Sequence, residues 1–172
     1  MLQPAQFELI ESLDKTRPRS FSSCRFKTDI CFDLVDVVSY NIYPKWYHNT
    51  PVAEYLDDLY KWIQTTPGEG KPFLITEVGA GAIYGYRTPA KVKWSEEYQV
   101  KALEEQLNAI LSYNDCSGVY IWQFCDVRVT NDWWNTRPRT MNNKGIMDEY
   151  RRPKLSYETV KRIFGSVDTY RK

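Results

Sequence analysis

Short apolar runs alternate along the chain with longer stretches in which apolar residues recur every three or four positions. The runs at residues 34–42, 72–76 and 118–124 have the length and composition of strands, and the last two are apolar enough to be buried on both faces. A weaker run near residues 20–26 predicts one more strand. These runs together predict a sheet of about four strands.

Helical periodicity follows each of the three strong runs, and a weaker helix is predicted near residues 4–13. Thr50 is the predicted cap of the first strong helix, with Pro51 at its first position, and Ser95 is the predicted cap of the second. The apolar stripes of the three helices are Val52, Leu56, Leu59, Tyr60 and Ile63; Val100, Leu103, Leu107, Ile110 and Leu111; and Leu155, Thr159, Ile163 and Phe164.

The alternation of strands and helices predicts parallel strands joined by helical crossovers. Each strand–helix unit takes about 40 residues, whereas a complete (β/α)8 barrel takes about 250. The 172 residues therefore form either a small open α/β sheet or half of a barrel. No repeat or flexible linker divides the chain, so we expect one domain over residues 1–172.

The composition is that of an ordinary globular domain, with 42% hydrophobic and 26% charged residues and a net charge of +1. This charge does not attract nucleic acid or an anionic membrane, and no apolar run approaches the roughly 20 residues that cross a bilayer. The first residues lack the basic and apolar regions of a signal peptide. Four cysteines without CxxC spacing predict buried free thiols in a reducing compartment. We therefore expect a cytoplasmic protein that binds neither nucleic acid nor membrane.

Aromatic residues are unusually abundant, at 15% of the chain with 13 Tyr and 6 Trp. Several of them, such as Tyr43, Tyr47 and Trp133, lie in polar segments that are typical of loops. Rings that carry a hydroxyl or an indole N–H suit sugars, whose C–H faces stack while their hydroxyls form hydrogen bonds. The alternative is that these rings fill gaps in the core.

Glu77 directly follows the apolar residues of the run at 72–76. The carboxyl ends of parallel strands are where α/β folds place their active sites. Gly79 and Gly81 allow the backbone to turn tightly and to leave the carboxylate unobstructed. From this spacing alone, Glu77 is either a catalytic carboxylate or a salt-bridged residue at the end of a strand.

The segment ITEVG (75–79) resembles the nucleophile segment of family 2 glycoside hydrolases, in which an apolar strand ends in Ile-Thr-Glu. Five other segments resemble motifs of that family in the same order, and together they cover nearly the whole chain: LDKTRPRS (13–20), DVVSYNIYPKWY (36–47), KWSEEYQ (93–99), IWQFCD (121–126) and NNKGIMDEYRRPK (142–154). The resemblance is to β-glucuronidases in particular. It implies that residues 1–172 are the C-terminal half, strands 5–8, of a TIM-type (β/α)8 catalytic barrel.

The resemblance also implies a retaining glycosidase, which uses two carboxylates roughly 5–5.5 Å apart. Glu77 would be the nucleophile. The family's acid/base is the Glu of an Asn-Glu pair at the end of strand 4, upstream of the segment that begins at Leu13, and this chain contains no Asn-Glu pair. We therefore expect the chain to be inactive alone, and to associate with itself or with the missing half of the barrel.

The family's sugar-binding roles transfer to this chain by motif position. Tyr43 and Tyr47 would line the sugar subsite, with the Tyr43 hydroxyl donating a hydrogen bond to Glu77. Trp122 would form the floor against which the sugar stacks. Tyr43 and Tyr47 follow the run at 34–42, and Trp122 lies near the end of the run at 118–124.

Asn142 and Lys144 match the N-x-K pattern with which β-glucuronidases hold the uronate carboxylate. An ammonium and an amide can pair with and donate to a carboxylate that neutral sugars lack. The alternative is that Lys144 is a surface lysine in the turn before Gly145. Three arginines of the preceding loop add positive charge that favours an acidic substrate: Arg128, Arg137 and Arg139.

These features imply an exo-acting enzyme that hydrolyses terminal β-D-glucuronides, with β-galactosides as the second choice of substrate and galacturonides as the third. Two carboxylates suffice for the chemistry, so no cofactor or metal is expected. A non-catalytic, sugar-binding half-barrel is the alternative from another functional class. Carbohydrate is the expected partner in either case.

Overall fold

Four parallel strands form the centre of the structure, a computed structural model that describes residues 3–167. They lie in the order β1-β2-β3-β4, so strands that are consecutive in the chain are neighbours in the sheet. Their bounds are β1 Ser22–Ser23, β2 Val38–Asn41, β3 Phe73–Val78 and β4 Cys116–Ile121. The predicted parallel α/β architecture is confirmed.

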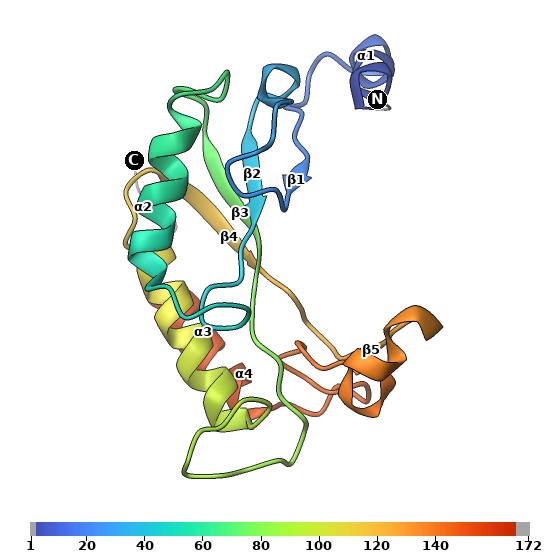
Figure 1. Ribbon diagram of the computed structural model, residues 1–172, viewed down its shortest axis with the longest axis vertical. Helices are drawn as coiled ribbons and strands as arrows, with labels where there is room; N and C mark the ends of the chain where they lie inside the picture. Colours follow the sequence, from blue (N-terminus) through green and yellow to red (C-terminus); the bar gives the residue numbers. More distant parts are fainter. Residues whose placement is uncertain (1–2, 168–172) are drawn as a thin grey trace.

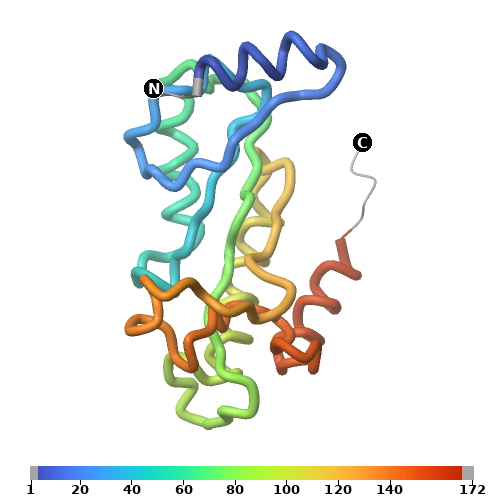
Figure 2. Tube along the Cα trace, turned by 90° about the vertical axis from the view of Figure 1, so that its right-hand side faces the viewer, coloured from blue at the N-terminus to red at the C-terminus, as the bar shows by residue number. Residues whose placement is uncertain are grey.

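The helices α2 (Val52–Ile63), α3 (Glu96–Leu111) and α4 (Leu155–Gly165) lie on one face of the sheet (Figure 1). The opposite face carries no helix along the strands, as the view from that side shows (Figure 2). Helix α1 (Gln3–Leu13) lies beyond the amino-terminal ends of the strands, while the loops that follow β2, β3 and β4 extend toward the other end (Figure 1). The sheet is therefore open and covered on one side.

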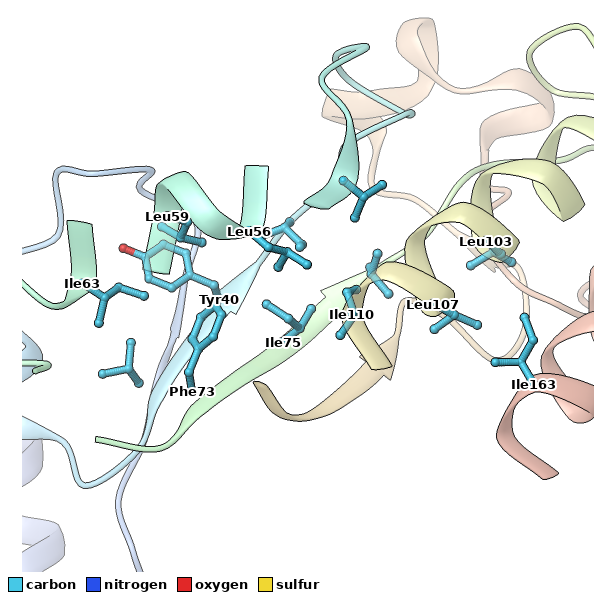
Figure 3. Packing of buried hydrophobic residues seen from close by; sticks show 14 of the residues in the cluster. Tyr40, Leu56, Leu59, Ile63, Phe73, Ile75, Leu103, Leu107, Ile110 and Ile163 are labelled. Carbon is cyan, nitrogen blue, oxygen red and sulfur yellow. The ribbon is translucent and has the colours of Figure 1, made fainter. Parts of the chain in front are cut away.

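The core fills the space between the sheet and its helices (Figure 3). Tyr40 on β2 and Phe73 and Ile75 on β3 are at most 1% exposed. The helical residues that pack against them are equally inaccessible to solvent: Leu56, Leu59, Ile63, Leu103, Leu107 and Ile110. These residues come from the predicted apolar stripes, because burial against a sheet requires one continuous helix face. Among the described residues, no helix is long and apolar enough to cross a membrane.

The prediction that residues 118–124 form a strand buried on both faces is wrong. Strand β4 ends at Ile121, which is half-buried, and Tyr120 is 62% exposed. Trp122 and Phe124, beyond the strand, are also exposed. The physical reason is that β4 is an edge strand whose second face has no covering layer. An apolar run indicates that a strand can be buried, but it does not show that a covering layer is present.

Three boundaries also differ from the predictions. Pro51 is the residue before α2, with an extended ψ of 137°, so it precedes the helix and Val52 begins it. The run at 34–42 divides into a 3-10 helix over Phe32–Leu34 and strand β2. The strand near 20–26 is reduced to the two residues of β1. Before β1, the Arg19 carbonyl oxygen accepts hydrogen bonds from the N–H groups of both Asp36 and Val37, while Arg19 N–H donates to the Asp36 side chain.

The exposed edge of β4 predicts the behaviour of the isolated 172-residue chain. Because an unpaired edge with exposed aromatic side chains pairs readily with another chain, we expect dimers or larger species by light scattering. Tyr120→Lys should shift the population toward the monomer. The control is Tyr150→Lys, which changes a 75% exposed tyrosine away from the sheet and should leave the distribution unchanged. A wild-type chain that stays monomeric at high concentration would contradict the prediction.

Candidate active site

Glu77 lies near the carboxyl end of β3 with its side chain half-buried. Its carbonyl oxygen accepts a hydrogen bond from Ile42 N–H at 2.8 Å, which ties the end of β3 to the end of β2. The Tyr43 hydroxyl donates a hydrogen bond of 2.5 Å to Glu77 Oε2, so the predicted contact between these two residues is confirmed. Burial raises the pKa of Tyr43, and the neighbouring Glu77 carboxylate raises it further, because a phenolate there would face a second negative charge. Tyr43 therefore remains a hydrogen-bond donor.

Lys144 reaches the same region from a turn that is 97 positions away from Tyr47 in sequence. Its Nζ donates a hydrogen bond to the Tyr47 hydroxyl at 3.0 Å and lies 5.2 Å from the ring centroids of both Tyr43 and Tyr47. Lys144 is only 3% exposed, so it is not a surface lysine. Burial lowers the pKa of its ammonium, against the opposing effects of Tyr47 and Glu77.

Arg137 brings a second cation to Tyr47. Its Nη2 donates to the Tyr47 hydroxyl at 3.5 Å, a long hydrogen bond between residues 90 positions apart. Burial opposes ionisation of Tyr47, but the hydrogen bonds from Arg137 and Lys144 outweigh burial and lower its pKa. The sequence placed Arg137 only in a basic loop; its position against Tyr47 is a result of the folded structure.

Asn142 contacts the backbone of this network, and Trp122 lies beside it. Asn142 Oδ1 accepts a hydrogen bond from the backbone N–H of Lys144 at 3.3 Å, which shapes the turn that presents the lysine. Trp122 follows β4, is 39% exposed, and is joined to Gln123 by a cis peptide bond. Its N–H donates to Val78 O at 2.9 Å. The structure thus brings Glu77, Tyr43, Tyr47 and Lys144 into contact and places Asn142 and Trp122 beside them.

Gly79 allows the segments that follow β3 and β4 to approach each other. A Cβ atom at this position would lie 2.3 Å from the Trp122 carbonyl oxygen and 3.9 Å from Lys144 Cδ. The first of these distances is too short for any side chain without a shift of the backbone. The glycine is therefore required by the close approach of Trp122, in addition to the tight turn that the sequence suggested.

Two glutamines of α3 hold the loops around the site, and neither was predicted from the sequence. Gln106 Nε2 donates to Pro44 O at 2.7 Å and Gly79 O at 3.3 Å. Gln99 Nε2 donates to Ala80 O at 2.8 Å and Gly145 O at 3.0 Å. The sequence feature that could have revealed them is a pair of polar residues on the buried side of the helix. Val100 and Leu111, which belong to the predicted apolar stripe, are only half-buried.

A buried ion pair between Lys154 and Asp126 supports the turn that carries Lys144. Lys154 Nζ lies 2.8 Å from Asp126 Oδ1, and both side chains are fully buried. The same ammonium donates to Ala82 O at 2.6 Å and Asn143 O at 3.1 Å, while Asp126 Oδ1 accepts from Gly145 N–H at 2.9 Å. Burial raises the pKa of Asp126 to about 6 in spite of the adjacent ammonium, and it lowers the pKa of Lys154. Nothing in the sequence pattern indicated this pair.

The comparisons with known proteins agree on one family. The family model described as "Glycosyl hydrolases family 2, TIM barrel domain" matches residues 4–169. A solved β-galacturonidase of this family from Eisenbergiella tayi, bound to galacturonate, is 70% identical with a TM-score of 0.96, over 98% of this chain and 30% of that one.

More distant relatives are β-glucuronidases. The solved enzyme from an uncultured Clostridium species is 30% identical with a TM-score of 0.79, over 92% of this chain and 28% of that one. The rat enzyme is 34% identical over 158 residues, which are 85% of this chain and 23% of that protein. The chain therefore spans less than a third of the length of these relatives.

The Lys154–Asp126 pair predicts a stability loss with a defined pH dependence. In the full-length protein, Lys154→Met leaves a buried carboxylate without its cation and should lower the free energy of unfolding by about 3–5 kcal/mol near neutral pH. The folded-state pKa of Asp126 would then rise further above its ordinary value of 3.8. Stability from the protonated form is present below that ordinary value and is lost as the pH rises through the folded-state pKa. Thermal unfolding should therefore show a larger loss at pH 8 than at pH 5.

The matched control is Lys161→Met, on the helix α4 that follows Lys154. Lys161 is exposed and lies 3.9 Å from Glu158, so this change should alter stability by no more than about 0.5 kcal/mol at either pH. Equal losses at pH 5 and pH 8 for Lys154→Met would show that the buried carboxylate is not the source of the destabilisation.

Proposed function

The chain belongs to glycosyl hydrolase family 2, and from this premise we propose that the protein it forms part of hydrolyses terminal β-D-uronides by a retaining mechanism. Residues 1–172 would be the C-terminal half of the catalytic barrel, with β1 to β4 as its strands 5–8. The observation that carries the proposal is a buried ammonium, Lys144, beside the carboxylate at the end of β3. Glu77 would be the nucleophile, and Lys144 would identify the sugar as an acid.

Glu77 is suited to nucleophilic attack because a hydrogen bond orients its carboxyl group and it lies near the end of a strand. Its Oε2 is held by the Tyr43 hydroxyl, which leaves Oε1 to approach the anomeric carbon. Attack would form the bond from carboxylate oxygen to sugar and break the bond to the leaving group, and water would then release the sugar with net retention. The acid that protonates the leaving oxygen would come from a part of the protein outside this chain.

The case for an acidic sugar comes from the cost of burying Lys144. An ammonium that is 3% exposed loses most of its hydration, and among the described residues it forms no ion pair. A substrate carboxylate would supply the missing partner, with the Tyr47 hydroxyl beside it. The amide nitrogen of Asn142 can donate to the same carboxylate, because the amide oxygen is used in the turn.

Both C4 epimers of a uronide satisfy this carboxylate site. The sequence motifs favoured glucuronide, but the 70% identity to a β-galacturonidase, against 30% to the Clostridium β-glucuronidase, favours galacturonide as the preferred substrate. A neutral β-galactoside would leave Lys144 unpaired and is a weaker candidate. The four cysteines are free thiols, which fits the cytoplasmic location that we propose, but the expectation that all of them are buried is wrong, since Cys24 is exposed.

The nucleophile is tested in the full-length protein with nitrophenyl β-D-galacturonide and glucuronide. Glu77→Gln should lower kcat by several orders of magnitude because the covalent intermediate cannot form. Azide added to Glu77→Ala should restore cleavage and yield the α-glycosyl azide, since it would attack from the vacated face. Glu69→Gln, in an exposed turn, is the control and should retain full activity. A Glu77→Gln enzyme with more than about a tenth of wild-type activity would contradict the assignment.

The carboxylate site is tested by Lys144→Ala on three nitrophenyl substrates. For the galacturonide and the glucuronide, kcat/KM should fall by an amount equivalent to about 1.5–3 kcal/mol, the scale of a lost charge-assisted hydrogen bond. The β-galactoside, which differs from the galacturonide only at C6, should be affected far less. Equal losses on the acidic and neutral sugars would mean that Lys144 is structural.

A further inference from the structure

Residues 127–142 form an excursion that leaves the end of β4 and returns to the turn before Lys144. The two-stranded sheet β5 (Val127–Arg128) and β6 (Met141–Asn142) closes its base, with Val127 paired to Asn142. Between them, the 3-10 helices over Asn131–Thr136 and Pro138–Thr140 project to the helix-free side of the sheet (Figure 1). The excursion is thus anchored at the proposed uronate site at both ends.

The excursion carries two arginines stacked on two tryptophans, with Arg128 at its base and Trp133, Trp134 and Arg137 between its two strands. The Arg128 guanidinium lies 5.5 Å from the ring centroid of Trp134, and that of Arg137 lies 5.7 Å from the ring centroid of Trp133. Trp133 is 54% exposed and Trp134 is 40% exposed. Trp134 Nε1 donates to Val129 O at 3.2 Å, which fixes the orientation of that ring.

The two stacked arginines keep their capacity to bind an anion. Arg139, in the same excursion, is engaged by Glu149. Arg128 and Arg137 form no ion pair with any residue that the structure describes, and stacking on a ring leaves the planar fork of N–H donors in place. Arg137 also touches Tyr47, so one of these cations is adjacent to the sugar-binding residues.

We propose that Arg128, Trp133, Trp134 and Arg137 form the subsite for the leaving group, and that this subsite selects a second acidic sugar. This inference rests on the proposed function, because the leaving group is defined by the bond that Glu77 would attack. The tryptophan rings would stack against the C–H face of the sugar, and the guanidinium forks would bind its carboxylate. The preferred substrate is then a uronate joined to another uronate.

Two disaccharides test the selection in the full-length protein. Both carry the same terminal uronate and the same linkage, and they differ only in whether the second sugar bears a carboxylate or its reduced, neutral hydroxymethyl group. The readout is the ratio of kcat/KM for the acidic and the neutral substrate, which reports the step that expels the leaving group. We expect the wild-type protein to favour the acidic disaccharide roughly 10- to 100-fold, as a charge-assisted hydrogen bond would.

Arg128→Gln should reduce this ratio about tenfold, because it removes one fork and keeps a polar side chain of similar length. Trp134→Ala should lower kcat/KM about five- to tenfold on both disaccharides, since stacking does not depend on the carboxylate. The matched control is Arg139→Gln, which removes the same charge from the same excursion but a guanidinium that Glu149 already engages. Its ratio should stay within about twofold of wild type, because long-range charge effects are screened.

The outcomes separate this inference from the function on which it rests. A wild-type protein that cleaves nitrophenyl uronides but treats the two disaccharides alike would overturn the leaving-group subsite alone. Failure to cleave any uronide would overturn the proposed function and the inference together. If Arg128→Gln lowers kcat/KM equally on both disaccharides and also lowers the Tm, the excursion is a structural contact with another part of the protein, and the inference is wrong.

Discussion

Backbone carbonyls that leave the sheet at Gly79 and Ala80 are buried beneath the loops, so each needs a donor from elsewhere in the chain. The amides of Gln106 and Gln99 provide those donors, and the same two side chains also hold Pro44 and Gly145. One helix thereby fixes the segments after β2 and β3 and the turn that carries Lys144. Because a buried carbonyl without a donor costs more than most single contacts contribute, the arrangement of Tyr43, Glu77 and Lys144 depends on these amides.

The site brings together a carboxylate, two tyrosine side chains and an ammonium. The Glu77 carboxylate is bonded to the neutral hydroxyl of Tyr43, and the Tyr43 and Tyr47 rings both lie close to the Lys144 ammonium. Tyr43 therefore contacts the carboxylate through its hydroxyl and lies close to the ammonium through its ring. A sugar that presents its anomeric carbon to Glu77 and its own carboxylate to Lys144 would be complementary to both of these groups.

Because the sheet is open, the candidate site at the ends of its strands is not enclosed on the helix-free side. Helices α2, α3 and α4 cover a single face, so the strands are rigid where they meet the core and exposed where a barrel interior would be (Figure 2). Exposed aromatic residues at the end of β4 and in the 127–142 excursion lie on this incomplete side. Their exposure fits a chain that spans less than a third of the length of its relatives.

The sequence by itself determined the features that depend on local spacing: the alternation of strands and helices, the apolar stripe of α2, and the position of Glu77 at the end of a strand. Of the stripe predicted for α4, only Ile163 is buried, and Ser156 and Val160 share its buried face instead. The Tyr43–Glu77 contact was also predictable, because the two residues lie in family motifs at the ends of neighbouring strands. Only the tertiary structure decided the exposure of β4, the pairing of Lys154 with Asp126, and the convergence of Lys144 and Arg137 on Tyr47. These contacts join residues 28, 97 and 90 positions apart, and periodicity carries no information over such distances. The burial of a polar side chain is likewise set by the partners that folding brings to it, as Gln99 and Gln106 show.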